Sequence, residues 1–276
     1  MSIDTTKVRY ISLIRMEGGE SVLNVPYAEM TVDPDLIAGF VTAVIIFAKT
    51  PIRTIRKAAY DILIEVGETV LVLLVVDPVP DESPYREKLK KILQNVESTH
   101  GRKLRDFEGD VRIFRDFALN IIKEFPYMEI DLDLVPIRRS GGSRIGFRVG
   151  DVDKKLEQVE AFINGKRTVA EILDLIGLPE EEVLAAISAL AKYKWIGFKR
   201  RLTENDILVR NDCHDVDIDK LRIQYEANAV DGLIASFDGV KSITEVFQSL
   251  QNDRYDRNAL WFLIHKLVEY GCLTPA

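Results

Sequence analysis

The chain has 276 residues, enough for two or three domains, and its 47% hydrophobic and 29% charged residues are ordinary for a globular protein. Its net charge of −7, from 44 acidic and 37 basic residues, disfavours a protein that wraps a polyanion such as DNA. The two cysteines are too few for a disulfide scaffold and are typical of a reducing compartment, and no apolar segment precedes the first charged residues, so we expect a soluble cytoplasmic protein.

The N-terminal residues predict a hairpin followed by a helix. Two strand-like runs, 8–15 and 21–27, lie on either side of a turn with two adjacent glycines. An aspartate N-cap and a proline at the first helical position then predict a helix over 33–49. This helix contains the longest apolar run of the chain, 36–48, which is too short for a transmembrane helix because a span takes about 20 residues.

Further strands and two more helices are expected next. The stretch 52–66 is mostly extended, and the continuous β-branched and leucine run 70–76 predicts a central strand buried on both faces. Apolar residues at helical spacing predict one helix that ends near Gly101 and another over 107–125. The glycine and arginine content of 136–150 predicts a linker or an exposed ribbon.

The C-terminal half contains one domain type twice. In the first copy a helix ends at Asn164-Gly165, a capping box of Thr168 and Glu171 starts the next helix, and a third helix leads into an extended segment after Tyr193. The matched positions are Gly165 with Gly239, Glu171 with Glu245 and Tyr193 with Tyr270, at offsets of 74, 74 and 77 residues. Three helices followed by an extended wing is the order of a winged helix.

The order of hairpin, helix, further strands and two closing helices resembles the longin domain. The related roadblock domain normally begins with a helix, which residues 1–7 are too short to supply. The segment 159–210 resembles the winged helix of nitrogen permease regulator 2-like proteins, with 202–209 as its second wing strand. The likeness rests on Phe162 to Gly165, Val169 to Ile176, Glu182, Val183, Ala186, Ile187 and Tyr193 to Gly197. The C-terminal copy resembles a later helical module of the same family.

These observations predict an α+β protein with a longin-like (roadblock/longin) α/β sandwich domain followed by tandem winged-helix domains. The expected boundaries are 1–127 for the longin-like domain, 128–152 for the linker or ribbon, 153–210 for the first winged helix and 211–276 for the second, winged-helix-like domain.

No group of side chains in the sequence predicts catalysis. The three histidines lack the spacing of a metalloprotease pair, and Asp212 to Asp215 lacks the usual spacing of metal ligands. The stretch 140–146 lacks the lysine of a phosphate-binding loop. We therefore expect no enzyme and no catalytic, cofactor-binding or metal site.

What the family resemblance implies is a scaffold or regulatory subunit that binds a small Ras-like GTPase of the Rag or Arf type. It also implies a longin or roadblock partner, or a second copy of the chain, in nutrient signalling or membrane traffic, with any peripheral membrane association made through partners. In that family an arginine in a loop of the longin sheet is linked to GTPase activation. The matching loop here, 66–69, contains no arginine, so an arginine finger is not carried over, and Arg53 or Arg56 would be guesses.

The alternative is a transcriptional regulator that binds DNA through its winged helices and has a longin-like sensor domain. In the first copy, however, the candidate recognition helix begins with Glu180 to Glu182, which would repel phosphates where base contacts normally start. The basic residues Lys192 to Arg201 near the wing are expected to be a solvated face. We therefore expect no specific binding of nucleic acid.

The helix over 33–49 is the expected interface, because its apolar residues surround the whole helix and its own sheet can cover only one side. The inner stripe would be Leu36, Phe40, Val44 and Phe47. The outer ridge, and the predicted interface, would be Ile37, Val41, Ile45 and Ile46. The alternative is that another part of the same chain covers this ridge.

Overall fold

The computed structural model describes residues 3–28, 34–48, 52–212, 216–250 and 256–276. The chain is a mixed α+β protein that forms two compact units, Met1–Arg200 and Arg201–Ala276. In the part of the chain that is described, no helix is long and apolar enough to cross a membrane.

A five-stranded antiparallel sheet begins the first unit, in the order β2-β1-β5-β4-β3. Its strands are β1 (Val8–Arg15), β2 (Ser21–Pro26), β3 (Thr54–Arg56), β4 (Asp61–Val66) and β5 (Val70–Val76). The predicted hairpin is confirmed, since β1 pairs with β2. The predicted central strand is also confirmed, because β5 lies between β1 and β4 and all of its residues are buried.

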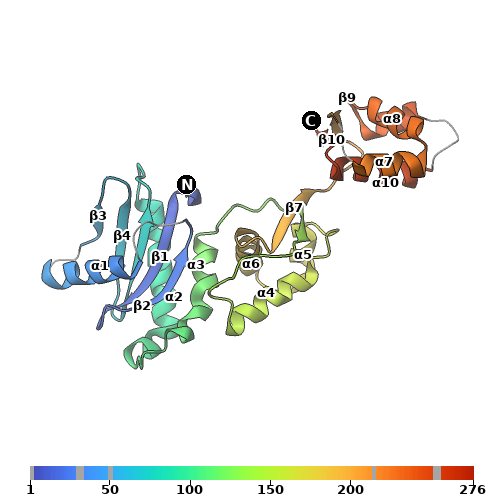
Figure 1. The fold of residues 1–276 in the computed structure, drawn as a ribbon. Coiled ribbons are helices and arrows are strands. Elements are labelled where there is room, and N and C mark those ends of the chain that lie inside the picture. The colour runs from blue at the N-terminus through green and yellow to red at the C-terminus, as the bar shows by residue number, and fades with distance from the viewer. Residues whose placement is uncertain (1–2, 29–33, 49–51, 213–215, 251–255) are drawn as a thin grey trace. The chain divides into compact units, whose positions relative to one another are not determined.

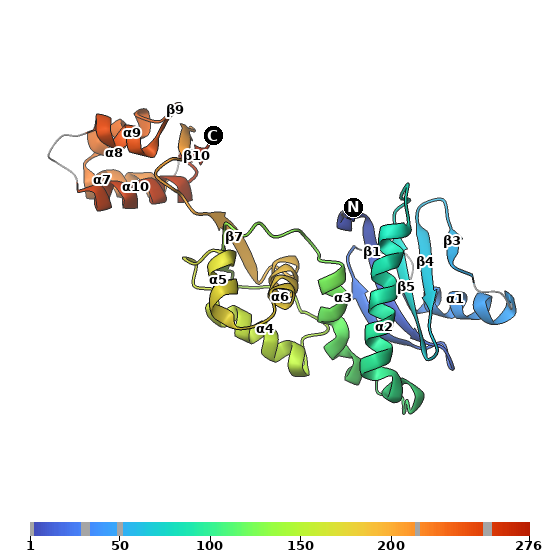
Figure 2. The ribbon, with the colours of Figure 1, turned by 180° about the vertical axis from the view of Figure 1, so that it is seen from behind.

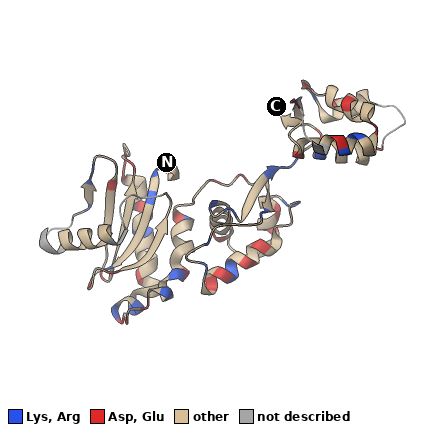
Figure 3. Ribbon diagram, in the orientation of Figure 1, with Lys and Arg blue, Asp and Glu red and all other residues tan. Residues whose placement is uncertain are grey.

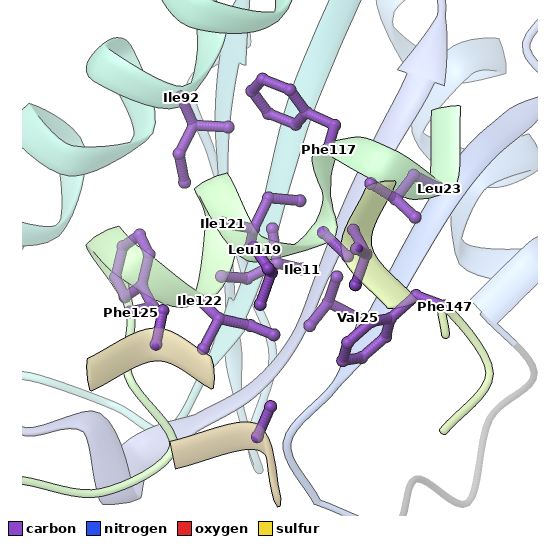
Figure 4. Packing of buried hydrophobic residues seen from close by; sticks show 14 of the residues in the cluster. Ile11, Leu23, Val25, Ile92, Phe117, Leu119, Ile121, Ile122, Phe125 and Phe147 are labelled. Carbon is purple, nitrogen blue, oxygen red and sulfur yellow. The ribbon is translucent and has the colours of Figure 1, made fainter. Parts of the chain in front are cut away.

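Helices cover both faces of this sheet (Figures 1 and 2). Helix α1 (Pro34–Ala48) lies on one face, and α2 (Ser83–Arg105) and α3 (Ala118–Glu124) lie on the other. Alternate residues of β5 therefore enter different cores: Val72 packs with the residues of α2 and α3, whereas Leu73 packs with those of α1. Figure 4 shows the first of these cores, where Ile92 of α2 and Ile122 of α3 pack over Ile11 of β1.

Two predicted helices differ from the observed ones. Helix α2 continues through Gly101 to Arg105, because its glycine lies in a buried turn of the helix and not at its end. The predicted helix over 107–125 is a 3₁₀ helix, η2 (Val111–Phe117), followed by α3, and Asp110 caps η2 by accepting a hydrogen bond from the Arg112 N–H.

The first unit continues with three helices and a two-stranded ribbon. The helices are α4 (Gly150–Phe162), α5 (Val169–Ile176) and α6 (Glu180–Lys192), and the ribbon pairs β6 (Leu134–Arg138) with β7 (Ile196–Arg200). The stretch predicted as a linker thus contains a strand of this module. Residues 202–209 do not form the second wing strand, because β7 pairs with β6 and β8 (Ile207–Arg210) pairs elsewhere.

The second unit begins at Arg201, ten residues before the expected boundary. Its helices are α7 (Val216–Tyr225), α8 (Ala227–Ala235), α9 (Ile243–Ser249) and α10 (Arg257–Glu269), and its sheet has the order β10-β8-β9, with β9 at Asp238–Ser242 and β10 at Leu273–Pro275. Cys272 is buried in this core.

The repeat predicted from the sequence extends to individual hydrogen bonds. Thr168 and Glu171 form a complete capping box, so that prediction is confirmed, and Ser242 and Glu245 form the same box in the second copy. In both copies, a strand that precedes the helices pairs with the strand that follows the third helix. The backbone bonds Ala170 N–H to Leu132 O and Arg139 N–H to Trp195 O are matched by Thr244 N–H to Glu204 O and Asn211 N–H to Cys272 O.

Candidate functional site

Helix α1 is oriented opposite to the prediction. Ile37 and Val41, predicted to face outward, are buried against the sheet beside Tyr10, Ile64 and Leu73. Ile45 is partly buried against the same core, and the side chain of Ile46 lies outside the described residues. The predicted interface of Ile37, Val41, Ile45 and Ile46 is therefore wrong for Ile37 and Val41, which face the sheet.

The outward face of α1 is apolar nevertheless. Leu36 is 68% exposed and Phe40 is 47% exposed, although both were predicted to form the inner stripe. The Lys57 ammonium lies 5.2 Å from the centre of the Phe40 ring. The candidate interaction surface of α1 thus consists of Leu36 and Phe40.

Helix α6 packs against α4 of its own module, and another of its faces is covered by α3 from the N-terminal part of the same unit. Ala185, Ser188 and Ala189 are all buried, and α6 packs against α3. The Met128 N–H donates to Ser188 Oγ at 3.3 Å, and Lys123 of α3 forms an ion pair with Glu181. These residues form a stripe that is separate from the residues that α6 presents to its own repeat. One face of α6, the helix predicted from the sequence as the candidate recognition helix, is therefore covered by a contact within its own unit.

The equivalent stripe of α10 is exposed within its own unit. An offset of 77 residues matches Ala185 with Phe262 and Ser188 with His265. Phe262 is 45% exposed, its ring lying 6.2 Å from that of Tyr225, and His265 is also exposed. The two copies thus differ at equivalent positions of α6 and α10. The side chains are small and buried in α6, but large and exposed in α10.

The loop at which the resemblance places an arginine is held by an acidic residue of α2. Glu97 Oε1 accepts hydrogen bonds from the Glu68 N–H at 2.6 Å and the Thr69 N–H at 3.0 Å. The side chain of Arg56, at the end of β3, forms an ion pair with Glu82 at 3.1 Å. The loop 66–69 is therefore fixed to α2 by these hydrogen bonds, and none of its four residues is an arginine.

The polar groups considered as possible ligands are not brought together by the described part of the chain. No group of three or more His, Cys, Asp and Glu side chains that could hold a metal ion occurs there. Cys213, His214 and Asp215 lie outside the described residues. His100 contacts Phe114 and Phe117, and its burial is the largest of the effects that lower its pKa below 6.5.

No protein-family model matches the chain, and no curated protein matches its sequence.

Proposed function

We propose that the protein is a non-enzymatic scaffold or regulatory subunit that binds a small Ras-like GTPase, or a longin or roadblock domain, in nutrient signalling or membrane traffic. Its N-terminal sheet has the element order that the longin resemblance implies: a hairpin, a helix on one face, three further strands and two helices on the other face. On this proposal the helices α4 to α6 of the first unit, and the helices of the second unit, belong to winged helices that bind protein.

The observation that best supports a protein-binding role is the contact between α6 and α3. A helix that reads DNA needs an exposed face rich in donors and cations, but α6 buries Ala185, Ser188 and Ala189 against its own unit. Its acidic first turn is already paired, since Lys123 binds Glu181 and Lys155 binds Glu182. The three helices α4, α5 and α6 therefore use α6 for packing within their own unit.

The surface proposed to contact a partner is the outward face of α1. Two large apolar side chains, Leu36 and Phe40, are exposed on one helix that otherwise packs on the sheet. Such residues are typical anchors of protein interfaces, because burying them on binding removes apolar area from water. A GTPase or a second longin-type domain could each supply the covering surface.

The experiment is binding of the full chain to a panel of small Ras-like GTPases loaded with GDP or a GTP analogue, with light scattering of the chain alone to detect self-association. We expect binding or self-association that weakens at least tenfold in Leu36→Ser and Phe40→Ser. The matched control is Ile223→Ser, which removes an apolar side chain that is 85% exposed in the second unit and should leave binding unchanged. Full affinity in both α1 variants would refute the proposed surface.

The alternative of a DNA-binding regulator has its own test. We expect no sequence-selective complex with duplex DNA at sub-micromolar protein concentration, at low or moderate salt. A salt-sensitive and sequence-selective complex that is lost on substitution of Arg257 at the start of α10 would favour the alternative. The equivalent position in α6 is Glu180, so only the second module offers a cation there.

A further inference from the structure

A pocket of about 490 Å³ lies in the first unit, at the outer edge of the sheet. One wall is the edge strand β2, another is η2, and the third is the segment 144–147, with Tyr193 also lining the pocket. This volume is within the range of about 300–1,000 Å³ that is usual for small-molecule sites.

The third wall is fixed to the end of α6. The Ser143 N–H donates to Tyr193 O at 2.7 Å, and the indole N–H of Trp195 donates to Ser143 O at 2.9 Å. Phe147 packs edge-on against Tyr193, with ring centres 5.9 Å apart, and lies beside Val25 (Figure 4). The segment predicted to be a linker is therefore an ordered wall, and the pocket is preformed.

The inner lining of the pocket is apolar. Val22, Leu23 and Phe147 line it, and each is buried. These side chains expose almost no surface to the pocket, so the apolar surface that a ligand would remove from water is that of Val111 and Tyr193, which are partly buried.

Two arginines from separate elements line the same pocket. Arg115 comes from η2 and is half-buried, and Arg144 comes from the third wall and is exposed. Neither side chain forms a hydrogen bond or ion pair with any described residue, although most of the half-buried arginines of this unit are paired, as Arg86 and Arg148 are. The hydrogen bond from the Arg112 side chain is the largest of the effects that lower the pKa of the nearby Asp110, and the positive charge of Arg115 adds a smaller effect.

A third polar group of the lining is Asn24 of β2. Its Oδ1 accepts hydrogen bonds from the hydroxyls of Ser12, at 2.8 Å, and Ser21, which fixes the orientation of the amide. The two hydrogens on Nδ2 have no partner among the described residues. Asn24 pairs with Ser12, so its amide lies on the face of the sheet that α1 covers and not on the face of Leu23 and η2. The groups of the pocket that can hold an anion are therefore the two guanidinium groups.

We propose that this pocket binds a small organic anion, with a carboxylate or phosphate held by Arg115 and Arg144 and an apolar, preferably aromatic, body against Val111 and Tyr193. Guanidinium groups match the oxygens of these anions and remain charged at all physiological pH values. Strand β2 and η2 belong to the part of the first unit that contains the five-stranded sheet, whereas Tyr193 follows α6. The ligand would therefore contact both parts of this unit. The proposal goes beyond the scaffold role and does not depend on which protein partner binds.

The experiment is titration calorimetry of the full chain with phenyl phosphate, phenylacetate and inorganic phosphate. We expect binding of at least one aromatic anion, and at least tenfold weaker binding of inorganic phosphate, which lacks the apolar body. The aromatic phosphate and carboxylate distinguish the two anionic groups. No measurable binding of either aromatic anion at millimolar concentration would overturn the proposal, as would equal affinity for inorganic phosphate.

Three variants test the assigned residues. Arg115→Ala and Arg144→Ala should each weaken binding about tenfold or more, whereas Arg112→Ala should not, because Arg112 is not in the lining and binds Asp110. Gly146→Leu should block binding without unfolding the chain, since Gly146 lines the pocket and a Cβ there would meet no atom within 4 Å. Unchanged binding in Gly146→Leu, with an unchanged melting temperature, would show that the ligand binds elsewhere.

Discussion

Lys194 has a left-handed backbone conformation that glycine has in the second copy of the repeat. Its φ is +61°, and that of the equivalent Gly271 is +74°. A left-handed conformation costs a residue with a side chain roughly 1 kcal/mol, whereas glycine adopts it freely. We therefore expect Lys194→Gly to raise the free energy of unfolding by about 0.5–1 kcal/mol.

The reverse substitution in the second copy is the matched control. Gly271→Ala should lower stability by about 1 kcal/mol, and the cause would be the backbone alone, because a Cβ at this position meets no atom within 4 Å. Urea unfolding of the full chain and of its second unit measures both effects. A stabilising Gly271→Ala would contradict this explanation.

Arg86 is the central residue of a polar network between α2 and the sheet. Its guanidinium donates to Glu65 at 2.9 Å, to Glu82 at 2.9 Å and to Thr54 Oγ1 at 2.6 Å. Glu65 is buried, so Arg86→Met would leave its carboxylate without a cation. We expect a loss of about 3–5 kcal/mol in the free energy of unfolding, whereas Arg112→Ala, which removes the exposed Arg112–Asp110 ion pair and keeps Asp110 as a cap, should have no measurable effect.

The same network predicts how stability depends on pH. Burial by itself raises the pKa of Glu82, but the hydrogen bonds and the charge of Arg86 outweigh burial, so the pKa lies below its usual 4.5. Since the pKa is lower in the folded than in the unfolded state, this contribution is complete above about pH 4.5 and is lost as the pH falls through the folded value. Unfolding curves at pH 3–7 should show that the free energy of unfolding falls less at acidic pH in Arg86→Met than in the wild type.

At the scale of single elements, the sequence predicts best those helices and strands that have a clear spacing of apolar residues or a clear cap or turn. The hairpin, the strand β5 and both capping boxes have strong local signals, and the structure contains them. Helix α1 was predicted correctly as a helix, but the face it buries was not. Apolar residues surround it, so no spacing distinguishes Val41 from Phe40, and only the shape of the sheet selects the inner face.

Strand β6 and the pocket wall were missed for a different reason. β6 is short, contains Pro136 and lies next to glycine-rich residues, so its local signals are those of a linker. Its partner β7 is distant in sequence, and such pairing leaves no local pattern. The clustering of Arg115 and Arg144 at one pocket likewise depends on tertiary structure, and no motif in the sequence marks it.

The orientation of α1 leads to a pair of opposite expectations. Val41→Asp would place a charge in the core between α1 and the sheet, and should lower stability by more than about 3 kcal/mol. Leu36→Asp lies on the exposed face and should change stability by less than about 0.5 kcal/mol. Circular dichroism melts of the two variants measure this difference, and a lower melting temperature for Leu36→Asp than for Val41→Asp would mean that α1 is oriented as the sequence suggested.

At the scale of the whole molecule, the boundary of the second unit can be tested by truncation. A fragment of residues 201–276 retains β8, the central strand of its sheet, together with the buried Leu202 and Leu208. We expect this fragment to unfold cooperatively on its own. A fragment of residues 211–276, cut where the repeat in the sequence suggested, lacks these residues and should be unfolded by circular dichroism and proton NMR.

The placement of β6 and β8 before their helices has a consequence for the order in which the chain can fold during synthesis. Each of these strands leaves the ribosome well before the strand that closes its module, so its hydrogen-bonding edge stays open while three or more helices are translated. Helices form locally and quickly, but the ribbon must wait for a contact between distant residues. Each module therefore becomes native only when its last strand, β7 or β10, has been made, and a chain released before that point exposes an unpaired edge to other chains.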